Sequence, residues 1–541
     1  MSKIFTLMII VLISVQININ SVYSNWMPIE KNNNTFIETD KSQFQNTSSN
    51  ITEEQDRGYL DENGVPLLSQ NDMAKNTDDS LQSDAISERI LNGLTAGDYL
   101  GSSVSGAGDV NGDGYEDVIV GAPLSDYTGA NSGRAYIYFG GPVFNSVPDK
   151  ILSGIAGELL GTSVSSAGDV NGDGYDDVIV SLPGYLSNTG RAYIYYGGAD
   201  MNTTRDITLT GEATGDYFGN SVAGAGDVNG DGFADVIIGA PYKATNTGKA
   251  YIYFGGSAMN NVVDVTLIQN IASEFFGFSV SSAGDFNGDG FSDVIVGAYG
   301  YSNSAGRTYM YLGGNTVNNV ADMTLLGFLI FESFGYSVSS AGDFNGDGYS
   351  DIVVGGYGYS NSLGRVYLYF GGTVLNSNPG VIITGQNTSD QFGKSVSGAG
   401  DVNGDGFDDI IIGAENFSSG TGKAYLFNGG TSSDNNADKI LSAENTGDRF
   451  GLFVSGIGDV NGDGNSDFII GAPNNDQNGT SSGRAYVYFN SMSGTDIEDL
   501  TFIGTADFDD FGMSVSNAGD VNADGFDDII IGQGKYNSQQ G

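Results

Sequence analysis

Short apolar runs recur along most of the chain at a nearly constant interval, separated by turn-forming residues. Runs such as Val118-Ile119-Val120 and Val236-Ile237-Ile238 contain only β-branched residues, which is typical of short strands buried on both faces. A stretch of small residues precedes each run and a strand rich in aromatic residues follows it, as residues 220–226 and 249–254 illustrate. Within these repeats, apolar residues do not recur at helical spacing. The pattern predicts an all-β fold.

A nine-residue acidic stretch marks the repeat. It first occurs at residues 109–117 and returns, barely altered, at intervals of 58 to 61 residues. In the third repeat we expect strands at 206–210, 220–226, 236–238 and 249–254. Four short antiparallel strands per repeat indicate a β-propeller built from four-stranded antiparallel blades. The copies begin at Asp109, Asp169, Asp227, Asp285, Asp343, Asp401, Asp459 and Asp520.

The repeats are compatible with a ring of either seven or eight blades. The glycine before the third strand lies 21 residues after the first Asp of its loop in most repeats, and Gly541, the last residue, holds that place in the eighth. The eighth repeat is therefore incomplete, and we expect the chain to be a fragment of a longer protein. Residues 87–92 resemble a fourth strand, which would complete the last blade of an eight-bladed ring. In a seven-bladed ring, the eighth repeat would begin a second unit.

Each acidic stretch has the donor pattern of a loop that binds a hard cation. Side-chain oxygens at positions 1, 3, 5 and 9 and a backbone carbonyl at position 7 match the first nine positions of an EF-hand calcium loop, and glycine at position 6 allows the sharp turn. Turns of Asp, Asn and Gly without metal are the alternative. Eight copies with three carboxylates each favour calcium, because like charges packed this closely are costly without a cation.

We assign these five positions of every loop as metal ligands, with about one Ca²⁺ per repeat, and we assign no catalytic or organic-cofactor residue. Position 12, a carboxylate in an EF-hand, is apolar here, so we expect the loops to join strands. Asn465 replaces the usual aromatic at position 7, where only the carbonyl would bind. The assigned ligands are Asp109, Asn111, Asp113, Tyr115, Asp117, Asp169, Asn171, Asp173, Tyr175, Asp177, Asp227, Asn229, Asp231, Phe233, Asp235, Asp285, Asn287, Asp289, Phe291, Asp293, Asp343, Asn345, Asp347, Tyr349, Asp351, Asp401, Asn403, Asp405, Phe407, Asp409, Asp459, Asn461, Asp463, Asn465, Asp467, Asp520, Asn522, Asp524, Phe526 and Asp528.

The composition excludes several classes of function. The chain has 66 acidic and 20 basic residues and a net charge of −46, which disfavours nucleic acid and anionic membranes as partners. It has no cysteine and no histidine, which excludes disulfides, thiol catalysis and imidazole-based catalysis or metal sites. The clustered carboxylates are committed to metal, and no acid pair outside the repeats stands out. We therefore expect no enzyme activity.

The N-terminal region predicts export. Residues 1–24 have the features of a signal peptide, with Lys3 before a short apolar core and a plausible cleavage site after Ser24. Residues 25–86 are polar and without periodicity, which predicts a disordered spacer before the propeller at 87–541. Asn46 and Asn50 begin glycosylation sequons, which would make the protein a glycoprotein in a host that uses them. We expect a secreted or cell-surface protein without direct membrane insertion after signal removal.

The residues around the loops resemble a known family. Phe218-Gly219 and Gly239-Ala240-Pro241 flank the loop of the third repeat, and Phe-Gly or Leu-Gly precedes every loop. This arrangement is similar to the FG-GAP repeat of the integrin α-subunit propeller and its bacterial relatives. The resemblance implies a calcium-stiffened extracellular propeller used for adhesion or ligand binding. That family usually has seven repeats, and this chain lacks both an inserted domain and an Asp-x-Ser-x-Ser metal site, so integrin-like ligand recognition is not carried over.

Three functions remain open at this point. The leading one is a secreted calcium-binding propeller that acts as an adhesion or ligand-binding module for an extracellular protein or glycan. The alternatives are a purely architectural surface module and the non-catalytic part of a larger exported enzyme. Aromatic residues such as Tyr185, Tyr301 and Tyr359 recur in the loops opposite the calcium loops. They would either form a ring that binds a ligand or pack each loop against its neighbour.

Overall fold

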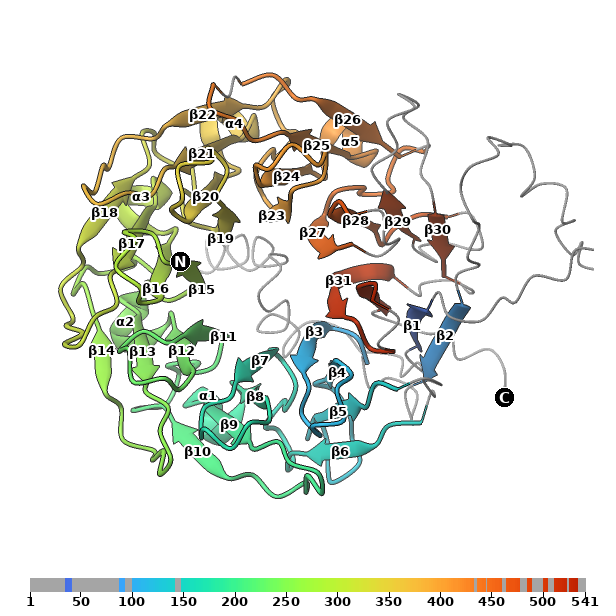
Figure 1. Ribbon diagram of the computed structural model, residues 1–541. Coiled ribbons are helices and arrows are strands. Elements are labelled where there is room, and N and C mark those ends of the chain that lie inside the picture. The colour runs from blue at the N-terminus through green and yellow to red at the C-terminus, as the bar shows by residue number, and fades with distance from the viewer. Residues whose placement is uncertain are drawn as a thin grey trace, which may run out of the picture.

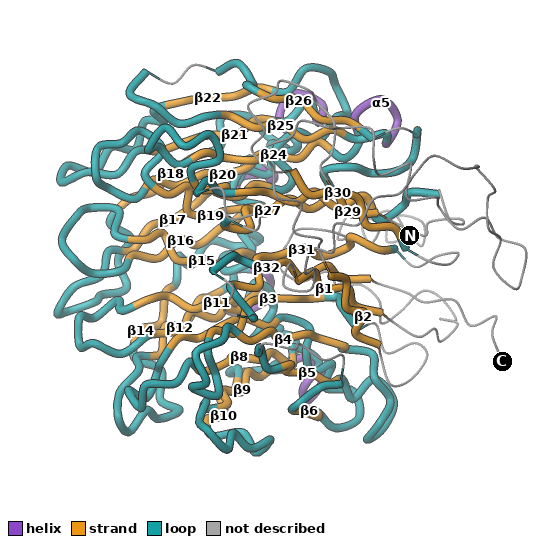
Figure 2. Tube along the Cα trace, turned by 45° about the vertical axis from the view of Figure 1, so that its right-hand side comes forward, coloured by secondary structure: helices purple, strands orange, loops and turns teal. Residues whose placement is uncertain are grey.

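The described residues form a ring of antiparallel sheets around a central axis (Figure 1). The structure is a computed structural model, and it describes residues 35–40, 87–92, 100–141, 147–432, 435–443, 445–459, 464–476, 484–488, 500–504, 510–522 and 525–533. Strands and loops make up almost all of it (Figure 2). The all-β class and the β-propeller predicted from the sequence are confirmed.

Each of the first seven repeats forms one four-stranded blade in which neighbouring strands follow one another along the chain. The first strands, nearest the axis, are β3 (Ser103–Gly108), β7 (Val164–Gly168), β11 (Ser221–Gly226), β15 (Ser279–Gly284), β19 (Ser337–Gly342), β23 (Val396–Gly400) and β27 (Phe453–Gly458). The second strands are β4 (Asp117–Ala122), β8 (Asp177–Leu182), β12 (Asp235–Ala240), β16 (Asp293–Ala298), β20 (Asp351–Gly356), β24 (Asp409–Ala414) and β28 (Asp467–Ala472).

The two outer strands of each blade complete the sheet. The third strands are β5 (Arg134–Tyr138), β9 (Arg191–Tyr195), β13 (Lys249–Tyr253), β17 (Arg307–Tyr311), β21 (Arg365–Tyr369), β25 (Lys423–Phe427) and β29 (Arg484–Tyr488). The fourth strands are β6 (Lys150–Ser153), β10 (Ile207–Thr210), β14 (Val265–Leu267), β18 (Met323–Leu326), β22 (Val381–Thr384), β26 (Lys439–Ser442) and β30 (Leu500–Ile503).

The eighth sheet combines strands from both ends of the chain. Among the described residues, the eighth repeat supplies β31 (Phe511–Gly519) and β32 (Asp528–Gln533), and β1 (Thr35–Asp40) pairs antiparallel with β32. Strand β2 (Ser87–Asn92) pairs with β1 and takes the fourth position, as its sequence suggested. Strand β1 falls within the segment expected to be a spacer. The other residues of that segment and residues 1–24, including both sequons, lie outside the described residues, so the domain boundaries stay a prediction.

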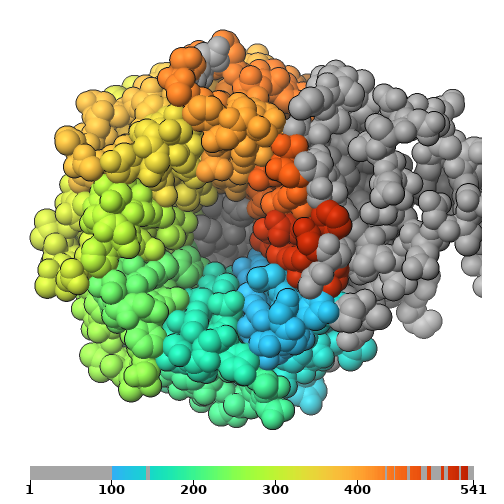
Figure 3. Space-filling model, in the orientation of Figure 1, coloured from blue at the N-terminus to red at the C-terminus, as the bar shows by residue number. Residues whose placement is uncertain are grey.

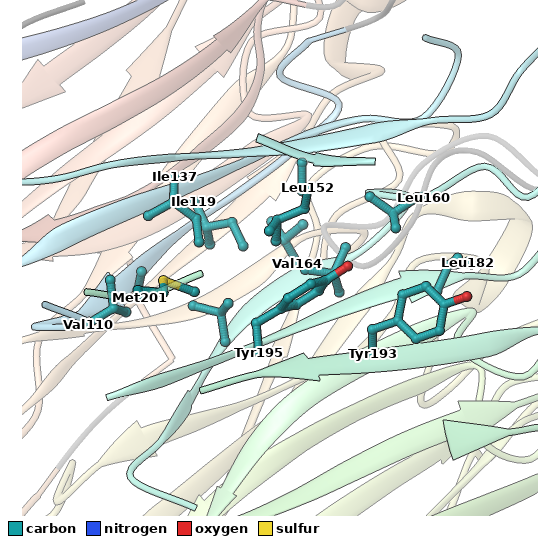
Figure 4. Packing of buried hydrophobic residues seen from close by; sticks show 14 residues of the cluster. Val110, Ile119, Ile137, Leu152, Leu160, Val164, Leu182, Tyr193, Tyr195 and Met201 are labelled. Atoms are coloured by element: carbon teal, nitrogen blue, oxygen red, sulfur yellow. The ribbon is translucent and has the colours of Figure 1, made fainter. Parts of the chain in front are cut away.

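Apolar layers between neighbouring blades hold the ring together. Alternate residues of a second strand face different neighbours: Val118 and Val120 pack with Ile530 of the eighth sheet, while Ile119 packs with Val178 of the second blade. Figure 4 shows Ile119 in this second layer, together with Val164 and Leu182 of the second blade. This arrangement explains why the second strands have no polar alternation, since both faces are buried. Comparable layers flank the eighth sheet on both sides, so the first and last repeats meet (Figure 3).

In every repeat except the second, which has Ser181 at one of the two positions, a pair of glycines lies where neighbouring blades meet. The N–H of Gly219 donates to the carbonyl oxygen of Gly239, 3.0 Å away in the same repeat. A Cβ atom on Gly239 would lie only 2.0 Å from the carbonyl oxygen of Gly277 in the next blade. Across the seam of the ring, a Cβ on Gly532 would lie 2.2 Å from the carbonyl oxygen of Gly101. At these junctions glycine lets the two backbones approach closely, whereas the second repeat has Ser181 at the position of Gly239.

Five segments drawn as helices are single turns with left-handed backbone in the loops between second and third strands. In one of them, Ser360, Asn361 and Ser362 have φ values of 46°, 60° and 58°. These segments are α1 (Tyr185–Asn188), α2 (Lys243–Asn246), α3 (Tyr301–Ser304), α4 (Tyr359–Ser362) and α5 (Phe417–Gly420). In the part of the chain that the structure describes, no helix is long and apolar enough to cross a bilayer.

Candidate metal centre

The acidic loops connect the first and second strands of the blades and lie on one face of the ring. In the first blade, the loop at residues 109–117 follows Gly108, where the ladder between β3 and β4 has a bulge and φ is +76°. The loops between third and fourth strands lie on the same face, because strand direction alternates within a blade. The loops between second and third strands lie on the opposite face. One face therefore carries every acidic loop.

Backbone N–H groups of each loop converge on its first Asp. In the first loop, Oδ1 of Asp109 accepts from the N–H groups of Gly112 and Asp113 at 2.7 and 3.1 Å, and Oδ2 accepts from Gly114 at 2.9 Å. Gly114 has a φ of +89° with no atom within 4 Å of a Cβ position, so the backbone conformation alone calls for glycine there. Asn111 accepts from Asp113 N–H at 2.8 Å and donates to its carboxylate at 3.0 Å. Positions 1, 3 and 5 are thus gathered in one turn.

The Asp at position 9 is buried beneath the loop. Asp117 is fully buried, and its two carboxylate oxygens accept from the N–H groups of Val110 at 2.8 Å and Gly140 at 2.7 Å. Burial, together with the charges of Asp113 and Asp109, raises the pKa of Asp117 to about 8 against the lowering effect of the two N–H groups. Burial likewise raises the pKa of Asp177, Asp235, Asp293, Asp351 and Asp409 to about 7.

This donor set fits a calcium ion on chemical grounds. The side chains at positions 1, 3, 5 and 9 all offer oxygen, and Oδ2 of Asp109, which accepts one N–H, keeps a second lone pair. The buried Asp117 lies close enough to Asp109 and Asp113 for their charges to disfavour its ionised form. A divalent cation would offset that repulsion.

Among the described residues, no group of three or more acidic side chains is arranged to hold a metal ion. The ligand assignments therefore stay predictions. In the seventh and eighth loops, Asn461, Asp463 and Asp524 lie outside the described residues, as does Ala523, which replaces glycine at position 4.

Eight segments of the chain match one family model. The match is to the FG-GAP repeat and together covers more than half of the chain. The matched residues are 100–138, 160–195, 218–253, 276–311, 334–369, 392–427, 450–488 and 511–541. The chain belongs to the FG-GAP repeat family.

Among curated proteins, this FG-GAP chain is similar to integrin alpha subunits. It is 34% identical to integrin alpha-5 of Xenopus laevis over 245 residues, which are 42% of this chain and 22% of that protein. It is 36% identical to integrin alpha-V of Gallus gallus over 222 residues, which are 38% of this chain and 20% of that protein. The chain therefore matches only about a fifth of the length of these relatives. Sqt1 from Chaetomium thermophilum, at 12% identity and a TM-score of 0.45, aligns over 81% of this chain and 97% of that one, which says nothing about function.

A second set of acidic residues was missed by the sequence analysis. Each FG-GAP repeat has an acid two residues before the Phe or Leu of its Phe-Gly or Leu-Gly pair, and this position could have been found from the period. In five of the six buried members the carboxylate accepts N–H groups of its own loop, as Glu332 does from Phe328 and Leu329 at 2.6 and 2.8 Å. Glu274 instead accepts the hydroxyl of Tyr309. These acids therefore shape the loop that leads into each blade. The buried members are Glu158, Asp216, Glu274, Glu332, Asp390 and Asp448.

Most of the recurring aromatics of the opposite face contact a cation of their own blade. The guanidinium of Arg191 lies 3.5 Å from the ring centroid of Tyr185, and Arg307 lies 3.4 Å from that of Tyr301. Arg365 covers Tyr359 in the same way at 3.5 Å. The cation begins the third strand of the same blade, so one face of each ring is already covered. Tyr242 instead packs against Tyr217 and Phe275, in the loops that lead into the third and fourth blades, with ring centroids 4.9 and 5.6 Å apart.

One FG-GAP repeat departs from the others on that opposite face. Leu326 and the run Phe328, Leu329, Ile330 and Phe331 are exposed by 48%, 61%, 43%, 60% and 66%. The corresponding run of the next repeat, residues 386–389, reads Gln-Asn-Thr-Ser. Glu332 is buried below the apolar run and fixes its backbone. The exposed side chains are therefore displayed by an ordered loop.

Proposed function

We propose that this FG-GAP protein is an exported calcium-binding propeller that serves as a non-catalytic adhesion or ligand-binding module. The observation that carries the calcium part is the repeated turn in which Asp109, Asn111 and Asp113 gather above the buried Asp117. Calcium bound there would link the turn to the first residue of the second strand and so stiffen each blade. Outside the cell, millimolar calcium would keep sites of modest affinity filled.

The calcium proposal is tested by direct binding. Protein stripped with EDTA and dialysed is titrated with CaCl₂ in a calorimeter, and the metal content of the saturated protein is measured by elemental analysis. About one ion per repeat is expected. Asp231→Ala removes the position-5 carboxylate of the third loop and should remove one site, whereas Asp200→Ala, an exposed acid outside the loops, should remove none. If the protein contains no bound calcium after titration with excess CaCl₂, the proposal is wrong.

The ligand part is supported by the apolar run at Phe328–Phe331, because ordered exposed apolar side chains are a common feature of protein-binding surfaces. Such a surface suits an extracellular protein better than a glycan, whose recognition needs several convergent polar groups. The similarity to integrin alpha subunits supports the same class of role.

The ligand part is tested with a panel of immobilised extracellular matrix proteins and glycans. In one variant, Phe328, Leu329, Ile330 and Phe331 become Gln, Asn, Thr and Ser, the residues of the next repeat. The control Val374→Ser changes a side chain that is 83% exposed on the face that carries the acidic loops. Saturable binding to a protein of the panel should be lost only in the first variant. Absence of saturable binding to the whole panel would favour the purely architectural role.

A further inference from the structure

The acidic loops of neighbouring blades are in direct contact. At every junction, the N–H at position 8 of one loop donates to the carbonyl oxygen at position 1 of the preceding loop. The eight bonds run from Asp176 to Asp109 (3.1 Å), Ala234 to Asp169 (3.0 Å), Ser292 to Asp227 (2.9 Å), Ser350 to Asp285 (3.2 Å), Asp408 to Asp343 (3.2 Å), Ser466 to Asp401 (2.8 Å), Asp527 to Asp459 (2.8 Å) and Glu116 to Asp520 (3.1 Å). Each loop thus touches the first ligand position of its neighbour.

The side chain at position 8 also lies against the preceding loop. A Cβ on Gly108 would lie 2.2 Å from Oδ2 of Asp176, and that oxygen accepts the N–H of Asp109 at 3.0 Å. In the same way, Oδ2 of Asp408 accepts the N–H of Asp343 at 2.7 Å. A carboxylate from one blade is therefore held beside the position-1 ligand of the blade before it.

Position 8 varies among the eight loops, whereas the side-chain ligand positions 1, 3, 5 and 9 do not. It is acidic at Glu116, Asp176, Asp408 and Asp527, and uncharged at Ala234, Ser292, Ser350 and Ser466. The acidic residues face the loops that begin at Asp520, Asp109, Asp343 and Asp459. Four loops thus have a neighbouring carboxylate that the other four lack, although the assigned ligands keep the same pattern.

We propose that the carboxylate at position 8 raises the cation affinity of the loop in the preceding blade, so that the eight loops form a tight class and a weak class. This inference rests on the calcium binding proposed above. The affinity of calcium loops rises with the number of charged groups at the site. One added charge several ångströms from a divalent cation in a water-like medium strengthens binding about tenfold by Coulomb's law.

Calorimetric calcium titration of the full chain at about 0.15 M salt tests the proposal. The unchanged protein should show four tight and four weak sites, one class for each kind of position 8. Asp176→Asn with Asp408→Asn keeps an oxygen for the Asp109 and Asp343 N–H groups but removes the charge, and should move two sites to the weak class. Ser292→Asp should add one tight site, and Ser292→Ala should change nothing.

The outcomes separate this inference from the function on which it rests. Failure of the chain to bind calcium would overturn both. Binding of about eight ions with one affinity, unchanged in the asparagine variants and in Ser292→Asp, would leave calcium binding intact and overturn the division into classes. A purely structural role of position 8 would give a loss with Asp176→Ala but none with Asp176→Asn. The charge effect should also shrink at higher salt, because exposed charges are screened.

Discussion

The N–H of Glu116 in the first repeat donates a hydrogen bond of 3.1 Å to the carbonyl oxygen of Asp520 in the eighth. The same bond joins every other pair of neighbouring loops, so the seam of the ring is built like the seven junctions within it. The contact of Gly532 with Gly101 and the packing of Ile530 on Val118 repeat the pattern on the other face and in the core. The ring is closed by backbone and apolar contacts common to all blades.

Removal of calcium should lower the melting temperature strongly. If each site has a Kd of ~10⁻⁴ M, ~1 mM calcium stabilises it by about 1.4 kcal/mol. Eight such sites give roughly 11 kcal/mol, comparable with the ~5–15 kcal/mol that stabilises a typical domain. Scanning calorimetry with EDTA and with 1 mM CaCl₂ measures the difference. An identical melting curve under both conditions would show that the ions are not structural.

Replacement of Gly239 by Ala should destabilise the ring by about 2–3 kcal/mol or more, because the new Cβ would overlap the carbonyl oxygen of Gly277. Backbone cannot move aside here without shifting a whole blade. Gly106→Ala is the matched control, since its Cβ would meet nothing closer than 3.4 Å. Urea unfolding of the two variants compares them, and equal midpoints would refute the proposed spacing role.

Deletion of residues 35–40 should open the eighth sheet. Strand β1 pairs with Ile529, Ile530 and Ile531 of β32, so its loss leaves the outer edge of β32 without a partner. Hydrogen exchange of the amides at 529–531 should accelerate, while the amides of β12 in the third blade stay protected. If the exchange rates of β32 do not change, β1 does not hold this position in solution.

The pH dependence of stability should report on Glu274. Burial raises its pKa from 4.5 to about 7, against the lowering effects of the Tyr309 hydroxyl and of Arg307. Between these two values the unfolded chain has released the proton and the folded chain retains it. The free energy of unfolding should therefore fall as pH rises through that range, by up to about 3 kcal/mol for this group.

Glu274→Gln removes the titrating group and keeps an oxygen for the Tyr309 hydroxyl, so it should flatten this part of the pH profile. Urea unfolding at pH 5 and pH 7.5 in saturating calcium measures the effect without interference from the loops. The same pH dependence in both proteins would show that the Glu274 carboxyl is not protonated in the folded state.

The repetition in the sequence made most of the fold predictable. Strands such as β12 follow from unbroken β-branched runs, and the turn at Gly114 follows from its acidic neighbours and a glycine at the position that needs positive φ. Strand β1 was not predictable in this way, because it has no copy elsewhere in the chain and its partner β32 comes from the other end. A single-copy strand carries no periodic signal.

The candidate site was predictable in its chemistry but not in its hydrogen bonds. The residue types at positions 1, 3, 5 and 9 indicate an oxygen-rich loop, yet the sequence does not show that Asp117 accepts N–H groups from both Val110 and Gly140. Gly140 follows the third strand, so this bond depends on how the whole blade folds. The position-8 side chains escaped notice for the same reason, since Asp176 reaches a loop that belongs to another blade.

The sharing of one sheet by β1, β2, β31 and β32 has a consequence for attachments. Any domain fused ahead of Thr35 or after Gln533 would be attached to this one sheet, at a distance from the blades on the other side of the ring. A circular permutant opened between β14 and β15 would carry its tethers on the far side instead. The position of the new termini would then decide which blades remain accessible to a binding partner.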